Sequence, residues 1–274
     1  MYRHHRIAVV MPIHDEEDRI ERAIARVPSF VDVILAVDDA SRDGTAARLR
    51  RIADERVLTI RHAKNRGVGA ATKTGYRRAL KTGADLIAVM DGDGQMDGRD
   101  LPALLDAAIA GADYVKGNRF LHRESLNAMP LARLAGNWLF SRLTRRAARC
   151  AVRLDAQCGY TVIRHAALLR LPLDALYDRY GFPNEMLFAA TLAGLRIASV
   201  AVRSIYETEV SGINPLTAVP MIGFLIARHW WRDRLGASVA NLFGVPPSGG
   251  MPERREMPPE GGTPCLIGAR HPSD

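Results

Sequence analysis

The chain has 274 residues, 47% of them hydrophobic and 25% charged, and this ordinary globular composition excludes a fibrous repeat or disorder over most of the length. Its formal net charge of +8 indicates an anionic partner such as nucleic acid, a phospholipid surface or a phosphorylated substrate. The three cysteines, Cys150, Cys158 and Cys265, lack metal-ligand spacing and are predicted to be reduced thiols.

The first half of the chain alternates short apolar runs with stretches of helical spacing. The runs predict strands at Ile7–Ile13, Val31–Val37, Val57–Ile60 and Leu86–Met90. The stretches after them predict helices at Glu17–Val27, Thr45–Asp54, Ala70–Thr82 and Leu101–Ala110. Such alternation is typical of βαβ units, so we expect an α/β domain with a Rossmann-like, doubly wound sheet that is mostly parallel.

The second half has a mixed pattern. It predicts helices at Leu131–Leu154 and Glu185–Gly194 and strands at Tyr160–Ile163 and Ile197–Ile205. The N-terminal apolar run is too short for a secretion signal, and prolines interrupt the uncharged run Val210–Ala227, so we expect neither export nor a spanning helix. We predict a catalytic domain over residues 1–212, an amphipathic membrane-interface segment over 213–244 and a Pro- and Gly-rich disordered tail over 245–274.

The segment after the fourth predicted strand carries two alternating carboxylates, Asp91 and Asp93, followed by Gln95. In open α/β sheets, ligands bind at the carboxyl ends of the strands. Two carboxylates on the same side of an extended chain suit a hard divalent ion, Mg²⁺ or Mn²⁺, that bridges two phosphates. A simple polar turn is the alternative, whereas Met96 and Pro102 exclude a calcium-binding loop of the EF-hand type.

A second acidic pair, Asp38 and Asp39, follows the second predicted strand. Of the two, Asp39 is the better candidate for binding a ligand. Ser41 and Asp43 come just before a predicted helix, where either side chain can cap it.

Further motifs follow in a fixed order along the chain. They are Pro12-Ile-His14-Asp15-Glu16-Glu17, Asn65-Arg66-Gly67-Val68-Gly69, Asp91-Gly92-Asp93-Gly94-Gln95, Gly117-Asn118-Arg119-Phe120 and Asp155-Ala156-Gln157-Cys158-Gly159-Tyr160. With this order and spacing, residues 6–212 resemble glycosyltransferase family 2, and within it the polyprenol-phosphate branch that includes dolichol-phosphate mannose synthases. The chain departs from the pattern at His14 and Asp15, where Tyr and Asn are common, and at Ala40, where Gly is frequent.

The resemblance implies a GT-A-type fold with a mixed, mostly parallel sheet and a role for each motif. It implies that Pro12, Glu16, Asp39 and the Lys64–Gly69 region, including Asn65 and Gly67, line the nucleotide-sugar pocket. It places Asp91, Asp93 and Gln95 around the metal ion and diphosphate, with Asp93 as a catalytic residue. It assigns Arg119 and Arg133 to the acceptor phosphate, and Arg203 is a weaker third candidate.

The predicted function is inverting transfer of a sugar from a GDP- or UDP-linked donor to a polyprenyl or dolichyl phosphate at the cytosolic membrane face. The alternative is transfer to a sugar hydroxyl in cell-surface polysaccharide synthesis, for which Asp155 or Glu185 would be the general base. A sugar-phosphate nucleotidyltransferase is disfavoured because its Gly-rich N-terminal loop is absent. A nucleic-acid-binding module lacks a recognition motif, and a non-catalytic nucleotide sensor does not need the acidic set, so we predict no nucleic-acid partner.

Two basic segments predict peripheral attachment to an anionic membrane surface on the cytoplasmic, inner side. Five arginines at helical spacing predict a basic stripe on one helix: Arg142, Arg145, Arg146, Arg149 and Arg153. A solvated helix face is the alternative reading of this stripe. The segment Ala218–Trp231 adds aromatic residues beside arginines, as an interfacial helix requires.

Overall fold

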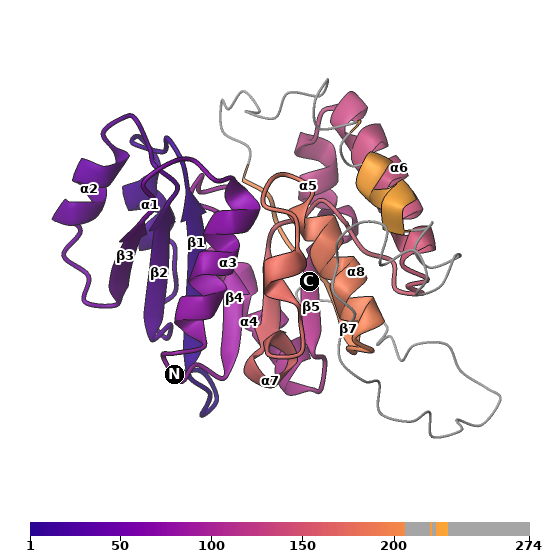
Figure 1. Ribbon diagram of the computed structural model, residues 1–274, viewed down its shortest axis with the longest axis horizontal. Coiled ribbons are helices and arrows are strands. Elements are labelled where there is room, and N and C mark those ends of the chain that lie inside the picture. Colours follow the sequence, from indigo (N-terminus) through magenta and orange to yellow (C-terminus); the bar gives the residue numbers. More distant parts are fainter. Residues whose placement is uncertain (206–219, 221–222, 230–274) are drawn as a thin grey trace.

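A computed structural model describes residues 1–205, 220 and 223–229, except for the side chains of residues 128, 132 and 133 (Figure 1). Its centre is a seven-stranded sheet with the order β3-β2-β1-β4-β6-β5-β7. The strands are β1 (Ile7–Ile13), β2 (Val33–Asp38), β3 (Val57–Arg61), β4 (Leu86–Val89), β5 (Tyr114–Asn118), β6 (Thr161–Arg164) and β7 (Ile197–Ala201).

The sheet is mixed and mostly parallel, as predicted. Strands β3, β2, β1 and β4 pair in parallel, and β5 pairs in parallel with β7. Strand β6 lies between β4 and β5 and is antiparallel to both, so every strand except β6 runs in the same direction. The carboxyl ends of β1, β2 and β4 therefore meet at one edge of the sheet.

Helices cover both faces of the sheet. They are α1 (Ile20–Ala25), α2 (Thr45–Arg51), α3 (Val68–Ala79), α4 (Leu101–Ile109), α5 (Arg123–Ala128), α6 (Leu131–Ala147), α7 (His165–Leu168) and α8 (Phe182–Leu192). Three short 3₁₀ turns are η1 (Gly98–Asp100), η2 (Arg119–Leu121) and η3 (Leu173–Ala175). Residues 223–229 are also helical, lie at the outer edge of the molecule (Figure 1) and contact α8 through the Arg228–Glu185 ion pair.

Two apolar cores follow from the alternation of side chains along the strands. In β1, Ala8 and Val10 face the core that contains residues of α3 and α8. Their neighbours Val9 and Met11 face the opposite core, which contains residues of α1 and α4. A strand buried on both faces reads as a continuous apolar run, which is why the sequence predicted β1 with the bounds that the structure has.

Several predicted helices and strands are longer than the observed ones. The predicted helix Leu131–Leu154 ends at Ala147, because Arg149 takes a left-handed conformation (φ +51°) and the Cys150 amide donates back to the Arg145 carbonyl. Arg149 and Arg153 thus lie beyond the helix, and the predicted basic stripe is limited to its first three arginines. The last predicted strand likewise ends at Ala201 rather than at Ile205.

The predicted boundary at residue 212 and the predicted tail lie outside the described residues. Of the predicted interface segment over 213–244, the structure describes residues 220 and 223–229. Within the described part of the chain, no helix combines the length and the apolar character needed to cross a membrane.

Candidate active site

The two carboxylates after β4 lie next to the end of β1. The Gly92 amide donates to the Pro12 carbonyl at 3.1 Å, and a Cβ on Gly92 would come within 2.8 Å of the Ile13 side chain. Glycine at this position therefore lets the chain after β4 pass close to β1. Asp91 and Asp93 flank this contact in the sequence, and the Asp91 carboxylate interacts with the charge of Glu16 in the loop after β1.

Asp91 is crowded by protein and by like charge. A Cβ on Gly159 would lie 2.8 Å from the Asp91 Oδ2, so only glycine leaves room for this carboxylate. Burial raises the pKa of Asp91 to about 7, and repulsion from Asp93 and Glu16 adds to the rise, against opposing effects of Arg119 and Lys116. Three mutually repelling carboxylates at one sheet edge are an environment that a cation would stabilise.

The loop that carries Asp93 and Gln95 has a defined shape. The Gln95 amide donates to the Asp93 Oδ1 at 2.9 Å, and the Gln95 carbonyl accepts from the Ile205 amide at 3.0 Å. Gly94 between them has φ +74°, a conformation that favours glycine, and its carbonyl accepts from Arg26. The two predicted ligands are thus held on one short turn.

The oxygen ligands at this edge fit a divalent ion whose remaining ligands come from the substrate. Among the described residues, no three His, Cys, Asp or Glu side chains form a ready metal site. Asp91 and Asp93 supply two carboxylates, and Mg²⁺ is commonly bound by one or two carboxylates together with substrate phosphates and water. The structure brings the predicted ligands together without completing a coordination shell.

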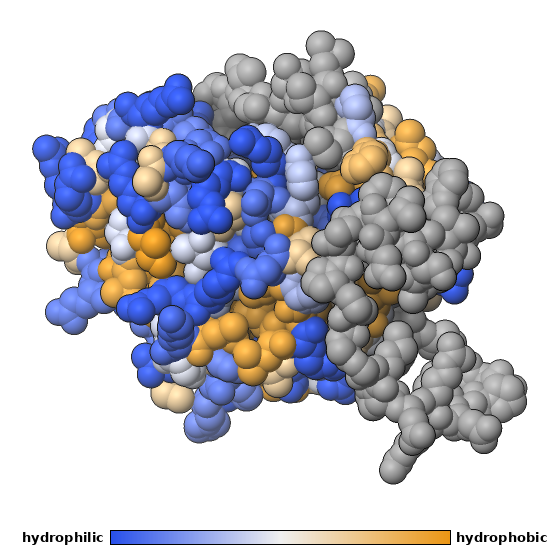
Figure 2. Space-filling model, viewed as in Figure 1, coloured by the Kyte–Doolittle hydropathy of each residue, from blue (hydrophilic) through white to orange (hydrophobic). Residues whose placement is uncertain are grey.

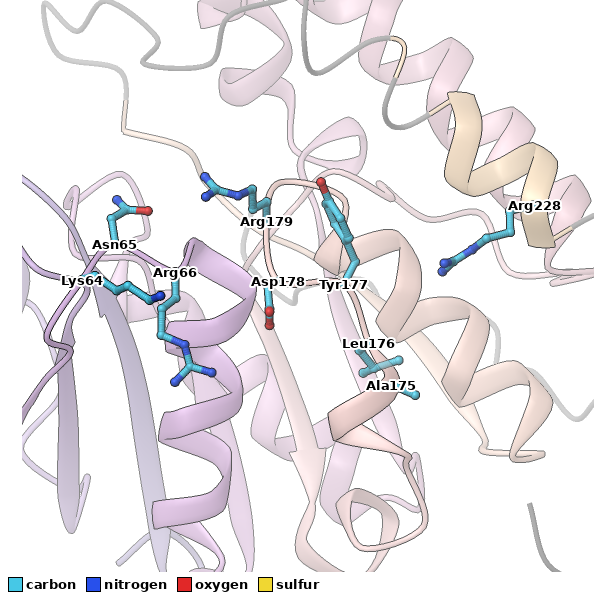
Figure 3. A pocket seen from close by; sticks show the side chains of 9 residues that line it. All are labelled: Lys64, Asn65, Arg66, Ala175, Leu176, Tyr177, Asp178, Arg179 and Arg228. Atoms are coloured by element: carbon cyan, nitrogen blue, oxygen red, sulfur yellow. The ribbon is translucent and has the colours of Figure 1, made fainter. Parts of the chain in front are cut away.

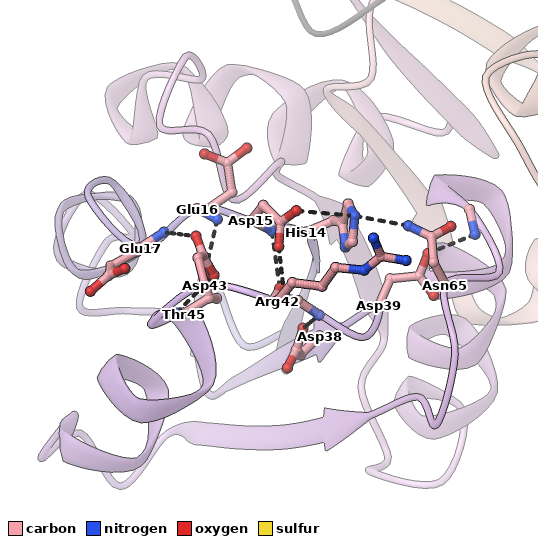
Figure 4. Close-up of polar contacts among 12 residues, drawn as sticks. His14, Asp15, Glu16, Glu17, Asp38, Asp39, Arg42, Asp43, Thr45 and Asn65 are labelled. Atoms are coloured by element: carbon pink, nitrogen blue, oxygen red, sulfur yellow. Dashed lines mark hydrogen bonds and ion pairs between the residues drawn. The ribbon is translucent and has the colours of Figure 1, made fainter.

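The loops after β1 and β2 are bonded to each other by side chains (Figure 4). The Asp15 amide donates to the Ser41 Oγ at 3.0 Å, and the Asp15 Oδ1 accepts from the Arg42 amide at 2.7 Å. The Glu16 amide donates to the Thr45 Oγ1 at 2.8 Å. Ser41 was predicted as a possible helix cap, but its hydroxyl instead fixes the loop that presents Glu16.

Asp39 joins the end of β2 to the loop before α3. Its buried carboxylate accepts from the amides of Arg66 at 2.9 Å and Gly67 at 2.6 Å. The Nδ1 of His62 lies 2.6 Å from its Oδ1. Asp39, Asn65 and Gly67 are therefore neighbours, as the resemblance implied, and Asp39 also holds the loop in place. Sequence analysis did not single out His62, which directly follows β3.

His14 connects the loop after β1 with the loop before α3. Its Nε2 lies 3.0 Å from the Asn65 Nδ2 and 3.4 Å from the Asp15 Oδ2 (Figure 4). Asp15 itself has φ +54°. Two of the three positions that depart from the family pattern, His14 and Asp15, thus lie at the rim of the predicted nucleotide pocket.

The predicted acceptor arginines differ in their surroundings. Arg119 follows β5, is 8% exposed and forms a two-pronged ion pair with the fully buried Asp155, with Nε–Oδ2 at 2.5 Å and Nη2–Oδ1 at 3.1 Å. Arg133 lies within α6, and its side chain is outside the described part of the structure. Arg203 pairs with the buried Asp100, with Nη2–Oδ1 at 2.9 Å.

Both candidate general bases are already paired with arginine. Asp155 is bound by Arg119, and Glu185, at the start of α8, accepts two hydrogen bonds of 2.8 Å from Arg228. Each carboxylate is thus engaged by a guanidinium rather than open to a substrate hydroxyl. The geometry does not favour either residue as a base.

A buried lysine beneath the site was missed by sequence analysis. Lys116 of β5 is fully buried, and its Nζ donates to the Cys158 carbonyl at 2.5 Å. Burial lowers its pKa, while Cys158, Asp155 and Asp91 act in the opposite direction. The sequence gives little signal for this burial, because Lys116 follows only two apolar residues, Tyr114 and Val115, and precedes Gly117-Asn118-Arg119.

Comparison with known proteins identifies the family. The family model described as "Glycosyl transferase family 2" matches residues 8–171. The chain belongs to glycosyl transferase family 2. The motifs at Glu16, Asp39, Asp91 and Asp155 all fall within the matched residues.

Relatives of this family 2 glycosyltransferase are matched over most of their length. It is 30% identical over 236 residues to the UDP-N-acetylglucosamine–dolichyl-phosphate N-acetylglucosaminyltransferase of Methanococcus voltae, covering 80% of this chain and 92% of that protein. It is 31% identical over 243 residues to the undecaprenyl-phosphate mannosyltransferase of Micrococcus luteus, covering 84% and 99% of the two chains.

A solved structure shares the fold of the family 2 enzyme described here. It is glucosyl-3-phosphoglycerate synthase from Mycobacterium tuberculosis in complex with Mn²⁺, UDP-glucose and glycerol 3-phosphate, with a TM-score of 0.56 and 20% identity over 84% of this chain and 80% of that chain. The predicted GT-A-type fold is thereby confirmed.

Proposed function

We propose that this glycosyltransferase moves a sugar, with inversion, from a nucleotide-diphosphate sugar to a polyprenyl phosphate. The observation that carries the proposal is the acidic edge of the sheet, where Asp91, Asp93 and Glu16 meet beside the Asp39 loop. This edge offers oxygen ligands for Mg²⁺ or Mn²⁺ next to a nucleoside pocket. The lipid phosphates named for the two relatives support the choice of acceptor.

The residues of the site have separable tasks in this proposal. Asp91 and Asp93 would hold the divalent ion, which would supply positive charge to neutralise the departing nucleoside diphosphate. Asp39 and Asn65 bind the nucleoside side of the donor. Gln95 keeps the turn that aims Asp93 toward the diphosphate, through the hydrogen bond from its amide.

An acceptor phosphate needs no general base. Its second pKa is about 6, so the attacking oxygen is already ionised at neutral pH. This agrees with the arginine pairing of Asp155 and Glu185. Transfer to a sugar hydroxyl would require a base. The two carboxylates predicted for that role, Asp155 and Glu185, are both paired with arginine.

We also propose peripheral attachment to an anionic membrane surface on the cytoplasmic side. Helix α6 exposes the large apolar side chains Leu131, Trp138, Leu139 and Leu143, and the Arg142 guanidinium lies over the Trp138 ring. Figure 2 shows hydrophobic residues at the surface at this outer edge of the molecule. Apolar side chains interleaved with arginine suit the boundary between headgroups and acyl chains.

A donor and acceptor screen tests the proposal. The full-length protein is incubated with Mn²⁺, GDP-mannose, UDP-glucose or UDP-N-acetylglucosamine, and undecaprenyl phosphate in detergent, and release of GDP or UDP is measured. We expect release that requires both the metal and the lipid phosphate and that is lost in Asp93→Asn. The exposed Asp18→Asn serves as the matched control. Turnover with undecaprenol or a free glycan, but not with the lipid phosphate, would contradict the acceptor assignment.

A further inference from the structure

The imidazole of His62 lies between the end of β2 and helix α3. Its Nδ1 is 2.6 Å from the Asp39 Oδ1, and its Nε2 is 3.0 Å from the Thr74 Oγ1. The His62 amide donates to the Asp38 carbonyl at 2.9 Å, so the backbone of this residue is fixed as well. The side chains of His62 and Asp39 are only 7% and 3% exposed. His62 therefore links the residue after β2 to α3 inside the protein.

The parallel pairing of β2 with β3 explains this placement. Asp38 is the register partner of Arg61, so the next residues of the two chains, Asp39 and His62, come side by side. Side chains at paired positions of neighbouring strands point to the same face of a sheet. The contact between the carboxylate and the imidazole therefore follows from the register of the sheet.

The hydrogen bonds around Asp39 decide which nitrogen of the ring carries a proton. Its Oδ1 accepts from the Arg66 amide at 2.9 Å, and its Oδ2 accepts from the Gly67 amide at 2.6 Å. Both oxygens thus act as acceptors, and the short contact to His62 requires a hydrogen atom on Nδ1. The Thr74 hydroxyl can donate or accept, so it satisfies Nε2 and keeps the ring from rotating.

The ring supplies the one donor to Asp39 that comes from the sheet and α3. The last torsion of an aspartate side chain is soft, and the amides of Arg66 and Gly67 belong to a single turn that would move together with the carboxylate. His62 is held instead by β2 through its backbone and by Thr74 through its ring. It therefore fixes the plane of the carboxylate relative to the sheet.

We propose that His62 is a positioning residue of the donor site. Its Nδ1–H holds the Asp39 carboxylate and, through it, the turn next to Asn65 in the geometry that receives the nucleoside. This role rests on the proposed function, in which Asp39 and Asn65 bind the nucleoside side of the donor. Ligand-binding groups are most effective when hydrogen bonds from neighbouring residues fix their orientation beforehand. The alternative is a histidine that only fills the space between β3 and α3.

Two substitutions separate the tasks of the two ring nitrogens. In His62→Asn the amide nitrogen takes the place of Nδ1 and can donate to Asp39, whereas in His62→Gln the longer side chain carries the amide to the position of Nε2, beside Thr74. Calorimetry with GDP and with UDP in the presence of Mn²⁺ measures nucleotide affinity in the full-length protein. We expect His62→Gln to weaken binding about tenfold and His62→Asn to weaken it less than about threefold, because only the second keeps the hydrogen bond to Asp39. In steady-state kinetics the KM for the donor should rise in the same order, while kcat changes less.

His165→Gln is the matched control. The Nδ1 of His165 also lies at hydrogen-bonding distance from an oxygen, 2.9 Å from the Ala84 carbonyl, but at the opposite edge of the sheet. We expect this variant to leave nucleotide affinity unchanged. Thermal unfolding of all three variants shows whether a loss of affinity merely follows a loss of stability.

Nitrogen-15 NMR of the unsubstituted protein tests the contact without any variant, because it distinguishes a ring nitrogen that carries a proton from one that does not. We expect a proton on the Nδ1 of His62, and its absence would overturn the proposal. Equal losses of nucleotide affinity in His62→Asn and His62→Gln, with intact binding by the wild type, would also overturn it, since His62 would then be only structural. A wild type that binds neither GDP nor UDP would instead overturn the proposed function, and the role of His62 with it.

Discussion

Arg119 and Asp155 form a two-pronged ion pair inside the protein, between the end of β5 and the loop before β6. Asp155 is fully buried and Arg119 is 8% exposed. The pair connects two motifs that are 36 residues apart in the sequence. Arg119, which is predicted to bind the acceptor phosphate, therefore also stabilises the structure of the site.

Replacement of Arg119 by lysine should destabilise the fold. Lysine keeps the charge but cannot reproduce two parallel hydrogen bonds to Asp155, so we expect the free energy of unfolding to fall by about 2 kcal/mol or more. The matched control is Arg99→Lys, because Arg99 forms a similar pair with Asp97 but is 73% exposed. There we expect a much smaller loss, because solvent screens the exposed pair. Urea denaturation measures both, and equal losses would show that burial of the Arg119 pair is unimportant.

The metal-free protein should lose stability as the pH rises. Burial and like charge raise the pKa of Asp91 from 3.8 to about 7. The folded state therefore holds a proton that the unfolded state has released, and the stability present below pH 4 is lost progressively up to pH 7, by at most about 1.4 kcal/mol per pH unit. Thermal unfolding between pH 4 and 8 should show this slope in EDTA and a smaller one with Mn²⁺. The same slope in Asp91→Asn would contradict the assignment to Asp91.

Replacement of Lys116 by methionine should change metal binding. The variant removes the donor to the Cys158 carbonyl and a buried positive charge that acts on Asp91. Because that charge also repels a divalent cation, we expect the dissociation constant for Mn²⁺, measured by calorimetry, to fall several-fold. Lys73→Met is the control, because Lys73 is also buried but donates to Leu176 away from the acidic edge. If both variants lose stability and neither changes Mn²⁺ affinity, Lys116 is only a structural residue.

Asp39→Asn should raise the KM for the donor more than it lowers kcat. The amide cannot accept all the hydrogen bonds that Arg66, Gly67 and His62 supply, so the loop carrying Asn65 shifts. Contacts to the nucleoside are made before and during transfer, and their loss weakens both states. Steady-state kinetics with varied donor measures the effect. A fall in kcat alone, at unchanged KM, would place Asp39 at the transfer step instead.

Apolar side chains of α6 should carry membrane attachment. In Trp138→Ser/Leu143→Ser, flotation with vesicles rich in anionic lipid should decrease, because less apolar surface enters the interface. Leu169→Ser/Leu192→Ser is the control, since those side chains are 64% and 68% exposed but lie outside α6. Binding of the wild type should also weaken with salt, which screens charge over about 10 Å at 0.1 M. Equal flotation of the two double variants would exclude α6 as the contact surface.

Local sequence determined the central strands of the enzyme and the acidic segments that follow them. Strand β1 has the predicted bounds, and β2 and β4 differ from theirs by one or two residues, because strands buried on both faces leave continuous apolar runs. The carboxylates Asp39, Asp91 and Asp93 were recognisable because they belong to the short acidic segments that follow such runs. Motif order was enough to indicate the family that the comparisons confirmed.

Other features depended on contacts between distant residues. Three of these features join segments that are dozens of residues apart. They are the antiparallel placement of β6 between β4 and β5, the burial of Lys116 and the pairing of Arg119 with Asp155. A pocket likewise lies between residues 64–66 and residues 177–179 (Figure 3). The hydrophobic periodicity of a sequence indicates only which face of its helix or strand a side chain occupies. Which partner that side chain meets is decided when the elements pack, since burial leaves a charged group stable only beside an opposite charge or hydrogen-bonding group.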